Sequence, residues 1–153
     1  HRHVQALYRE LLADVEGIKL HEAPSAEFDS NYWLSTATLD PDMRIKGQEK
    51  AYRKIITGAV GGAAGVTHRV ESATTDCQPN DNVEALRMAL DAAGIESPLW
   101  KPMHRQPVYR NAPAYVNGVS EALFKVGICL PAGPWVTDEH VRYIVDSIKG
   151  AKA

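Results

Sequence analysis

The segment 99–107 (LWKPMHRQP) places the tightest local constraint on this chain, because it holds two prolines in nine residues. Pro102 has no amide hydrogen, fixes its own φ and pushes Lys101 toward an extended conformation. The side chains of Trp100, Lys101 and His104 are therefore displayed in a restricted arrangement. Polar clusters that follow a strand often contact ligands in α/β folds. A structural role, with Trp100 in the core and His104 at the surface, fits the same residues.

Length and composition exclude several classes of protein. The 153 residues suit one domain, and the 17 basic and 19 acidic residues form no basic block, which argues against nucleic-acid binding. The apolar runs are too short to cross a bilayer and no signal segment opens the chain, so we expect a soluble, cytoplasmic protein. Cys77 and Cys129 lie far apart and predict two free thiols. The chain does not begin with Met, so we expect it to be part of a longer polypeptide.

The first forty residues predict one helix and two strands. Apolar residues at three- and four-residue steps predict a helix over 4–15, ended by Gly17. Alternating residues predict a strand over 18–22, and β-branched and aromatic residues predict a second over 30–40. Asn31 and Trp33 lie at the mouth of this second strand. There they either meet a ligand or pack.

Residues 42–82 predict an insertion that differs from its flanks. A charged helical pattern at about 48–56 leads into a glycine-rich run and a polar tract. The run lacks GxxxxGK[ST] and GxGxxG, so we expect no phosphate loop. The metal-ligand types among these residues show no repeated spacing, so we expect no metal site; they are His68, Glu71, Asp76 and Cys77. The segment is therefore predicted to be flexible or loosely packed.

The pattern after the insertion begins with a helix and a strand. Asp81 and Glu84 predict a capping box for a helix over about 83–93, which Gly94 ends. Residues 95–100 predict a third strand, which leads into the segment 99–107.

The remaining residues predict two helices and one strand. Ser120 is expected to cap a short helix after a loop over 108–118, and residues 128–131 predict a fourth, brief strand. Thr137 is a good N-cap for a final helix that ends near residue 149. In total the pattern predicts an α+β fold, a small and mostly antiparallel sheet with helices over one face.

Three segments in this order resemble the C-terminal domain of the DegT/DnrJ/EryC1/StrS aminotransferases: FDSNYWLSTATLDP, NVEALRMALDAAGIES-PLWKPMH and GVSEALFKVGICLPAGPWVTDEHVRYIV. That family consists of fold-type I, pyridoxal-phosphate-dependent enzymes that aminate nucleotide-linked keto sugars for surface polysaccharide or glycan biosynthesis. The resemblance implies that residues 1–153 form a single C-terminal small domain with an insertion at about 42–82. It also implies that the full enzyme is a homodimer that takes a nucleotide sugar and a glutamate donor.

In that family a large N-terminal domain holds pyridoxal phosphate through a Schiff-base lysine, an aspartate and a stacking aromatic. No segment of this chain matches those motifs, and Lys101 is not that lysine by position. The resemblance therefore implies that the large domain is absent here, that no catalytic residue lies in this chain, and that the chain alone does not transaminate. A stand-alone binding or interaction module, derived from the same domain without catalysis, is the alternative.

The resemblance also points to substrate-binding residues. These are His104, Lys101 and Trp100 of the PLWKPMH motif, with Asn31 and Trp33 of the NYW motif. The cation and the imidazole would bind a hydroxyl, phosphate or keto oxygen of the nucleotide sugar, beside an apolar Trp wall. One departure bears on this site, because family members commonly read ESRPLWKPMH and this chain lacks the arginine. Lys101 does not replace a bidentate donor.

Overall fold

A three-stranded antiparallel sheet in the order β1-β2-β3 forms the centre of the protein. The structure is a computed structural model, and it describes residues 1–51, 77–109 and 111–153. The strands are β1 (Ile18–Leu20), β2 (Ser35–Leu39) and β3 (Gly127–Leu130). The register places Thr38 opposite Lys19 and Thr36 opposite Cys129.

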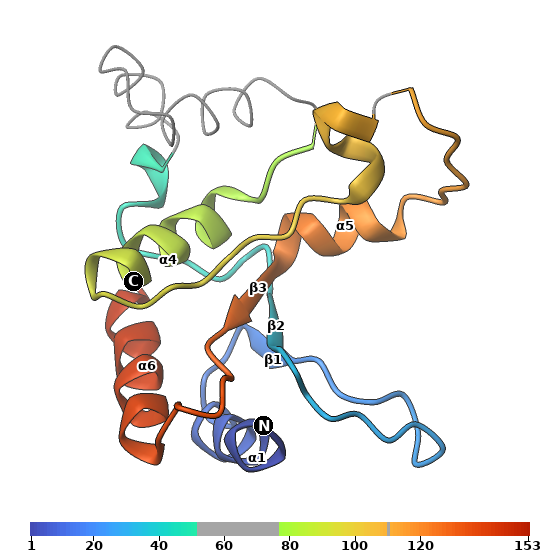
Figure 1. Cartoon of the computed structure of the whole chain (residues 1–153). Coiled ribbons are helices and arrows are strands. Elements are labelled where there is room, and N and C mark those ends of the chain that lie inside the picture. The colour runs from blue at the N-terminus through green and yellow to red at the C-terminus, as the bar shows by residue number, and fades with distance from the viewer. Residues whose placement is uncertain (52–76, 110) are drawn as a thin grey trace.

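Four α-helices in the described residues lie around this sheet (Figure 1): α1 (Arg2–Leu11), α4 (Asp81–Ala92), α5 (Val119–Val126) and α6 (Asp138–Ala151). The same part of the chain also contains the short 3-10 helices η1 (Gln48–Lys50), η3 (Met103–Arg105) and η4 (Pro107–Tyr109). α1, α4 and α6 lie together, whereas α5 lies at the start of β3 (Figure 1). The predicted α+β fold with a small antiparallel sheet is confirmed.

The core lies between the sheet and α1, α4 and α6. Residues of β2 alternate between buried and half-buried, so that Ala37 and Leu39 enter the core while Thr36 and Thr38 face the other side. The helices contribute large, fully buried side chains: Tyr8, Leu86, Leu90, Val141, Val145 and Ile148. Burying one such aliphatic side chain is worth about 2 kcal/mol relative to leaving it exposed.

The predicted third strand over 95–100 is wrong. These residues form no strand in the structure, although Cys129 N–H donates to the Pro98 carbonyl at 3.4 Å. Pairing stops there because Pro98 has no amide hydrogen to return. The amide of Ile95 is also used, since it donates to the Leu90 carbonyl at the end of α4. The described sheet therefore has three strands, not four.

The two ends of α4 show one wrong prediction and one that is confirmed. The N-cap is Asn80, whose side chain makes no capping bond, and Glu84 pairs with Arg87 at 2.6 Å instead of closing a capping box with Asp81. At the other end Gly94 has φ +74° and its amide donates to the Asp91 carbonyl. Together with the Ile95 amide, this forms a Schellman motif that ends the helix.

Gly17 does not end the first helix, because α1 stops at Leu11. It lies in the turn into β1 with φ +88°, and a Cβ built on it would come 2.8 Å from Met43 Cβ. A glycine is needed at position 17 because of its positive φ and because Met43 lies so close. Neither requirement can be read from the helical periodicity of the sequence. At the other end of the chain Thr137 caps α6 through the His140 amide, as predicted.

The described ends of the predicted insertion are packed, not loose. Met43, Ile45 and Ala51 are buried in the core, and Ile45 forms an isolated bridge with Lys152. Asn82 donates from Nδ2 to the carbonyls of Asp40 and Met43, both at 2.9 Å. The glycine-rich run, the rest of the predicted helix over 48–56, and His68, Glu71 and Asp76 lie outside the described residues.

Two further findings concern ions and membranes. In the ranges 1–51, 77–109 and 111–153, no group of three or more His, Cys, Asp or Glu side chains is arranged to hold a metal ion. None of the helices in those ranges is long and apolar enough to cross a membrane. Cys129 is a free thiol, as predicted, and burial raises its pKa, whereas Cys77 is buried.

Candidate ligand-binding face

Two tryptophans from distant parts of the chain meet at the surface. Trp33 precedes β2 and Trp100 follows α4, and their ring centroids lie 6.2 Å apart at an interplanar angle of 78°. Such edge-to-face pairs are favourable. Both side chains nevertheless remain about 60% exposed, at 62% for Trp33 and 60% for Trp100. An exposed aromatic pair of this size is typical of a surface that meets a ligand or another protein.

Local hydrogen bonds set the backbone that carries Trp33. Asn31 Oδ1 accepts from the Trp33 amide at 3.0 Å, and Ser30 Oγ accepts from the Tyr32 amide at 3.1 Å. Tyr32 has φ +51°, a left-handed conformation that a tyrosine adopts only where its surroundings hold it. The Asn31 side chain thus shapes the turn through its oxygen.

A carboxylate network fixes this loop to the first helix. Glu22 accepts from Arg9 at 2.9 and 2.7 Å, from the Tyr32 hydroxyl at 3.1 Å and from Gln5 at 3.3 Å. The Arg9 hydrogen bond, followed by those of Tyr32 and Gln5, holds the pKa of Glu22 below its ordinary value. The loop that carries Trp33 is therefore anchored on α1.

His104 is held by a second carboxylate. Its Nε2 lies 2.6 Å from Oε1 of Glu121, in the first turn of α5, and Arg105 Nε lies 3.4 Å from the same oxygen. The hydrogen bond from His104 is the main cause that lowers the pKa of Glu121. His104 is thus neither a core residue nor a freely solvated one.

Lys101 lies between Trp100 and His104 in the sequence. Its side chain is half-buried, and its carbonyl oxygen accepts from Gln106 Nε2 at 3.3 Å. The structure therefore brings Trp33 and Trp100 into contact, and it carries Lys101 and His104 on the same short segment as Trp100.

Two pockets flank the tryptophan pair. The first has a volume of about 680 Å³, and its aromatic lining residues are Trp33, Trp135 and Tyr143. The second has about 350 Å³ and lies on the Thr36 and Thr38 side of the sheet. Its other lining residues include Trp100, Leu123 and Phe124. Pro98 and Cys129 line both pockets, so the two open on either side of the proline segment.

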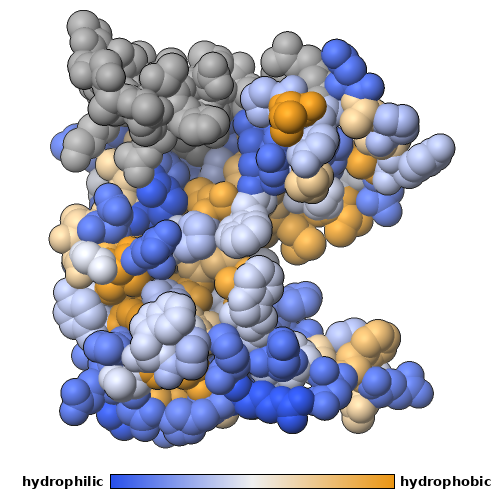
Figure 2. Space-filling view, viewed as in Figure 1, coloured by the Kyte–Doolittle hydropathy of each residue, from blue (hydrophilic) through white to orange (hydrophobic). Residues whose placement is uncertain are grey.

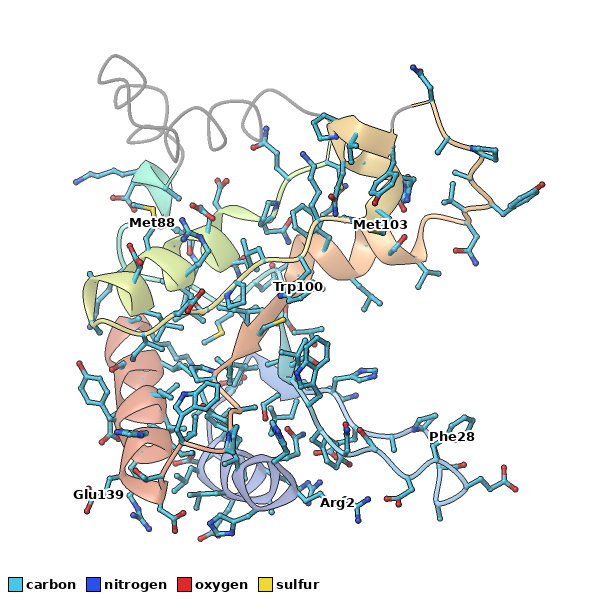
Figure 3. All side chains as sticks on the ribbon, in the orientation of Figure 1. Arg2, Phe28, Met88, Trp100, Met103 and Glu139 are labelled. Carbon is cyan, nitrogen blue, oxygen red and sulfur yellow. The ribbon has the colours of Figure 1, made fainter. Side chains whose placement is uncertain are left out.

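The surface around these pockets is concave and partly apolar. Figure 2 shows a deep hollow on one side of the molecule, between the arm that carries Phe28 and the region of α5. Trp100 lies near the middle of the molecule and Met103 lies further out along the same segment (Figure 3). The exposed large side chains of the arm, of the segment 99–107 and of α5 include Phe28, Trp33, Trp100, Met103, Val119 and Leu123.

Sequence reasoning did not find Glu121. In the helical pattern Glu121 looks like any other polar residue, and it lies 17 residues from His104 in the sequence. The N-cap of α5 is Gly118, so the predicted cap Ser120 is wrong. Glu121 lies in the first turn of α5, a favourable location for a carboxylate, but this location does not predict its partner. Trp135 and Tyr143 were missed for the same reason, because only the fold brings them to the first pocket.

The structure is thus a small α+β fold with an exposed pair of tryptophans beside two pockets. Residues 60–149 match the model of the DegT/DnrJ/EryC1/StrS aminotransferase family. The match covers more than half of the chain, and the chain belongs to this family. The matched range includes residues 60–82 of the predicted insertion.

The relatives are longer than this chain. EpsN of Bacillus subtilis (strain 168), named as a pyridoxal phosphate-dependent aminotransferase, is 38% identical over an alignment of 92 residues that covers 55% of this chain and 23% of EpsN. The chain therefore spans about a quarter of the length of that curated relative.

Solved structures of aminotransferases share the fold. TlmJ from Streptoalloteichus hindustanus aligns with a TM-score of 0.61 at 14% identity, over 98% of this chain and 30% of TlmJ. A DegT DnrJ EryC1 StrS aminotransferase from Brucella abortus aligns with a TM-score of 0.56 at 21% identity, over 97% of this chain and 29% of that protein. DesI, solved in the presence of its TDP-sugar product, aligns with a TM-score of 0.60 at 20% identity, over 97% of this chain and 29% of DesI.

Proposed function

We propose that this chain is the C-terminal small domain of a pyridoxal-phosphate-dependent aminotransferase that acts on nucleotide-linked keto sugars in surface polysaccharide or glycan biosynthesis. Membership of the family supports the reaction class. The alignment with about 30% of each solved aminotransferase supports the assignment of residues 1–153 to one domain of a larger enzyme. DesI binds a TDP-sugar product, which supports a nucleotide-sugar substrate here.

The observation that carries the proposal is the exposed Trp33–Trp100 pair, with the carboxylate-held His104 four residues after Trp100 on the same segment. The two indoles provide an apolar wall for the sugar or the base. His104 and Lys101 provide polar groups that bind a hydroxyl, phosphate or keto oxygen, and Asn31 adds its amide nitrogen. This is the usual composition of a ligand site, an apolar surface with a few placed polar groups.

The residues present do not fit pyridoxal phosphate itself. Cofactor attachment needs a lysine amino group in the pocket, and the lining of neither the 680 Å³ nor the 350 Å³ pocket in the described part of the chain includes a lysine or an aspartate. We therefore assign the cofactor, its lysine and the chemistry to other parts of a full-length cytoplasmic homodimer with glutamate as donor. This chain alone is expected to be inactive.

The test is His104→Ala in the full-length enzyme. Loss of one ligand hydrogen bond is worth about 1.4 kcal/mol, so the KM for the nucleotide sugar should rise about tenfold with the fold intact. His3→Ala is the matched control. His3 Nε2 also lies 2.6 Å from a carboxylate oxygen, that of Asp138, but His3 is part of α1 and not of the segment 99–107. A KM that does not change in His104→Ala contradicts the assignment of His104.

The second candidate is a stand-alone binding module, and the lack of a lysine in both pockets favours it. An immunoblot of source cells with an antibody to residues 120–149 separates the two. A natural product more than twice this length supports the aminotransferase. A product of this length that binds nucleotide sugar supports the module.

A further inference from the structure

Glu121 occupies a place from which it controls the ring of His104. Its Oε1 lies 2.6 Å from His104 Nε2, and the two side chains are only 16% and 17% exposed. The hydrogen bond joins η3 to the first turn of α5 across 17 residues. Arg105 and Ser120 contact the same carboxylate, at 3.4 Å each, so Glu121 is itself held in place.

This contact determines which ring nitrogen is available. An ionised carboxylate only accepts hydrogen bonds, so Nε2 must carry the hydrogen at this distance. The other ring nitrogen, Nδ1, then has no partner among residues 1–51, 77–109 and 111–153. Carboxylates that orient an imidazole in this way fix both its tautomer and its direction.

We propose that Glu121 is a positioning residue, which fixes the His104 ring with its proton on Nε2 and presents Nδ1 to the nucleotide sugar. The inference rests on the proposed function of His104. It adds the atom that meets the ligand and the residue that orients this atom.

Kinetics of the full-length enzyme test the positioning role. Glu121→Ala should raise the KM for the nucleotide sugar about tenfold and leave the KM for glutamate unchanged, because only the His104 side of the site is disturbed. Glu121→Gln should fall between Glu121→Ala and wild type, since its amide oxygen still accepts from Nε2. Combining Glu121→Ala with His104→Ala should raise the KM no further than His104→Ala alone, because the two residues act as a unit.

Asp138→Ala is the matched control. Asp138 is also a carboxylate in the first turn of a helix and also contacts a histidine Nε2 at 2.6 Å. It pairs with the exposed His3 and should leave the KM for the nucleotide sugar unchanged.

NMR of the present chain provides a readout that needs no cofactor. A proton shared between a mostly buried imidazole and a carboxylate should give one downfield N–H resonance that is protected from exchange. It should disappear in both His104→Ala and Glu121→Ala and persist in Asp138→Ala, with backbone amide spectra otherwise preserved.

The outcomes separate the two levels of the argument. An unchanged KM in His104→Ala overturns the proposed function together with this inference. A raised KM in His104→Ala with wild-type kinetics in Glu121→Ala, or an N–H resonance that survives Glu121→Ala, overturns the inference alone. Additive effects of the two substitutions likewise contradict a positioning role.

Discussion

The hydroxyl of Tyr32 donates a hydrogen bond to the carboxylate of Glu22, 3.1 Å from Oε2, while the Tyr32 backbone is held at φ +51°. The contact joins the turn before Trp33 to a carboxylate that α1 also grips through Arg9. A left-handed tyrosine costs about 1 kcal/mol or more, so the turn persists because this contact and its neighbours offset that cost. The orientation of Trp33 therefore depends on a network outside the candidate face.

Tyr32→Phe should lower the free energy of unfolding by about 1 kcal/mol, because it removes a hydrogen bond to a charged group that is partly exposed. Urea denaturation of the chain measures this. Tyr115→Phe is the control, since Tyr115 is 100% exposed and should show no change. If wild type and Tyr32→Phe have equal free energies of unfolding, the hydrogen bond does not stabilise the fold and the prediction is wrong.

Stability should depend on Glu22 at acidic pH. Its pKa is lowered in the folded chain, chiefly by Arg9, so its stabilising contribution is present above its ordinary pKa of 4.5 and is lost as the pH falls through the folded value. Asp14 and Glu121 also have lowered pKa values and add to the same decline. The specific prediction is that the difference in stability between wild type and Glu22→Gln narrows from pH 6 to about pH 3. A difference that stays constant over that range contradicts it.

Arg87→Met should be strongly destabilising, by about 3 kcal/mol, because it leaves the carboxylate of Glu84 buried without its bidentate partner. The double variant Glu84→Gln/Arg87→Met removes the buried charge as well and should recover part of the loss. Thermal or urea unfolding of the three proteins checks the order. A double variant that is less stable than Arg87→Met means that the charge of Glu84 is not the cause.

Gly17→Ala should cost more than Gly47→Ala. Both glycines have positive φ, +88° and +77°, which costs an alanine about 1–2 kcal/mol at either site. Only at Gly17 does the new Cβ also meet Met43, at 2.8 Å, whereas Gly47 has open space. The excess loss of unfolding free energy at Gly17, about 1 kcal/mol or more, measures the contact with Met43. Equal losses at the two sites would show that Met43 moves aside freely.

The sequence predicts the described α-helices and all three strands of the described sheet because each has a clear hydrophobic pattern, and some also have an end signal. Gly94 and Thr137 illustrate this, since both act on neighbours within a few residues. The misread strand over 95–100 shows the limit of that reasoning. Its apolar residues and Pro98 favour an extended backbone, but a strand also needs a partner with matching donors, which only the fold supplies.

The candidate site likewise has residues that the sequence reveals and contacts that only the fold creates. His104, Trp100 and Trp33 stand out because rare side chains lie within short motifs, and their pairing with residues far along the chain is not visible in either motif. Glu121 is an ordinary helical glutamate until the chain folds, when it lies 2.6 Å from His104. Gly17 shows a related limit, because the need for a glycine there comes from Met43, 26 residues later.

The single hydrogen bond from Cys129 to the Pro98 carbonyl has a consequence for association. It covers the outer edge of β3 with a residue that accepts but cannot donate, so the sheet does not extend into the following segment. Open strand edges template pairing between molecules, and a proline beside the edge is one of the devices by which proteins prevent it. The segment that carries Trp100 thus also covers a strand edge that would otherwise be open to pairing with another molecule.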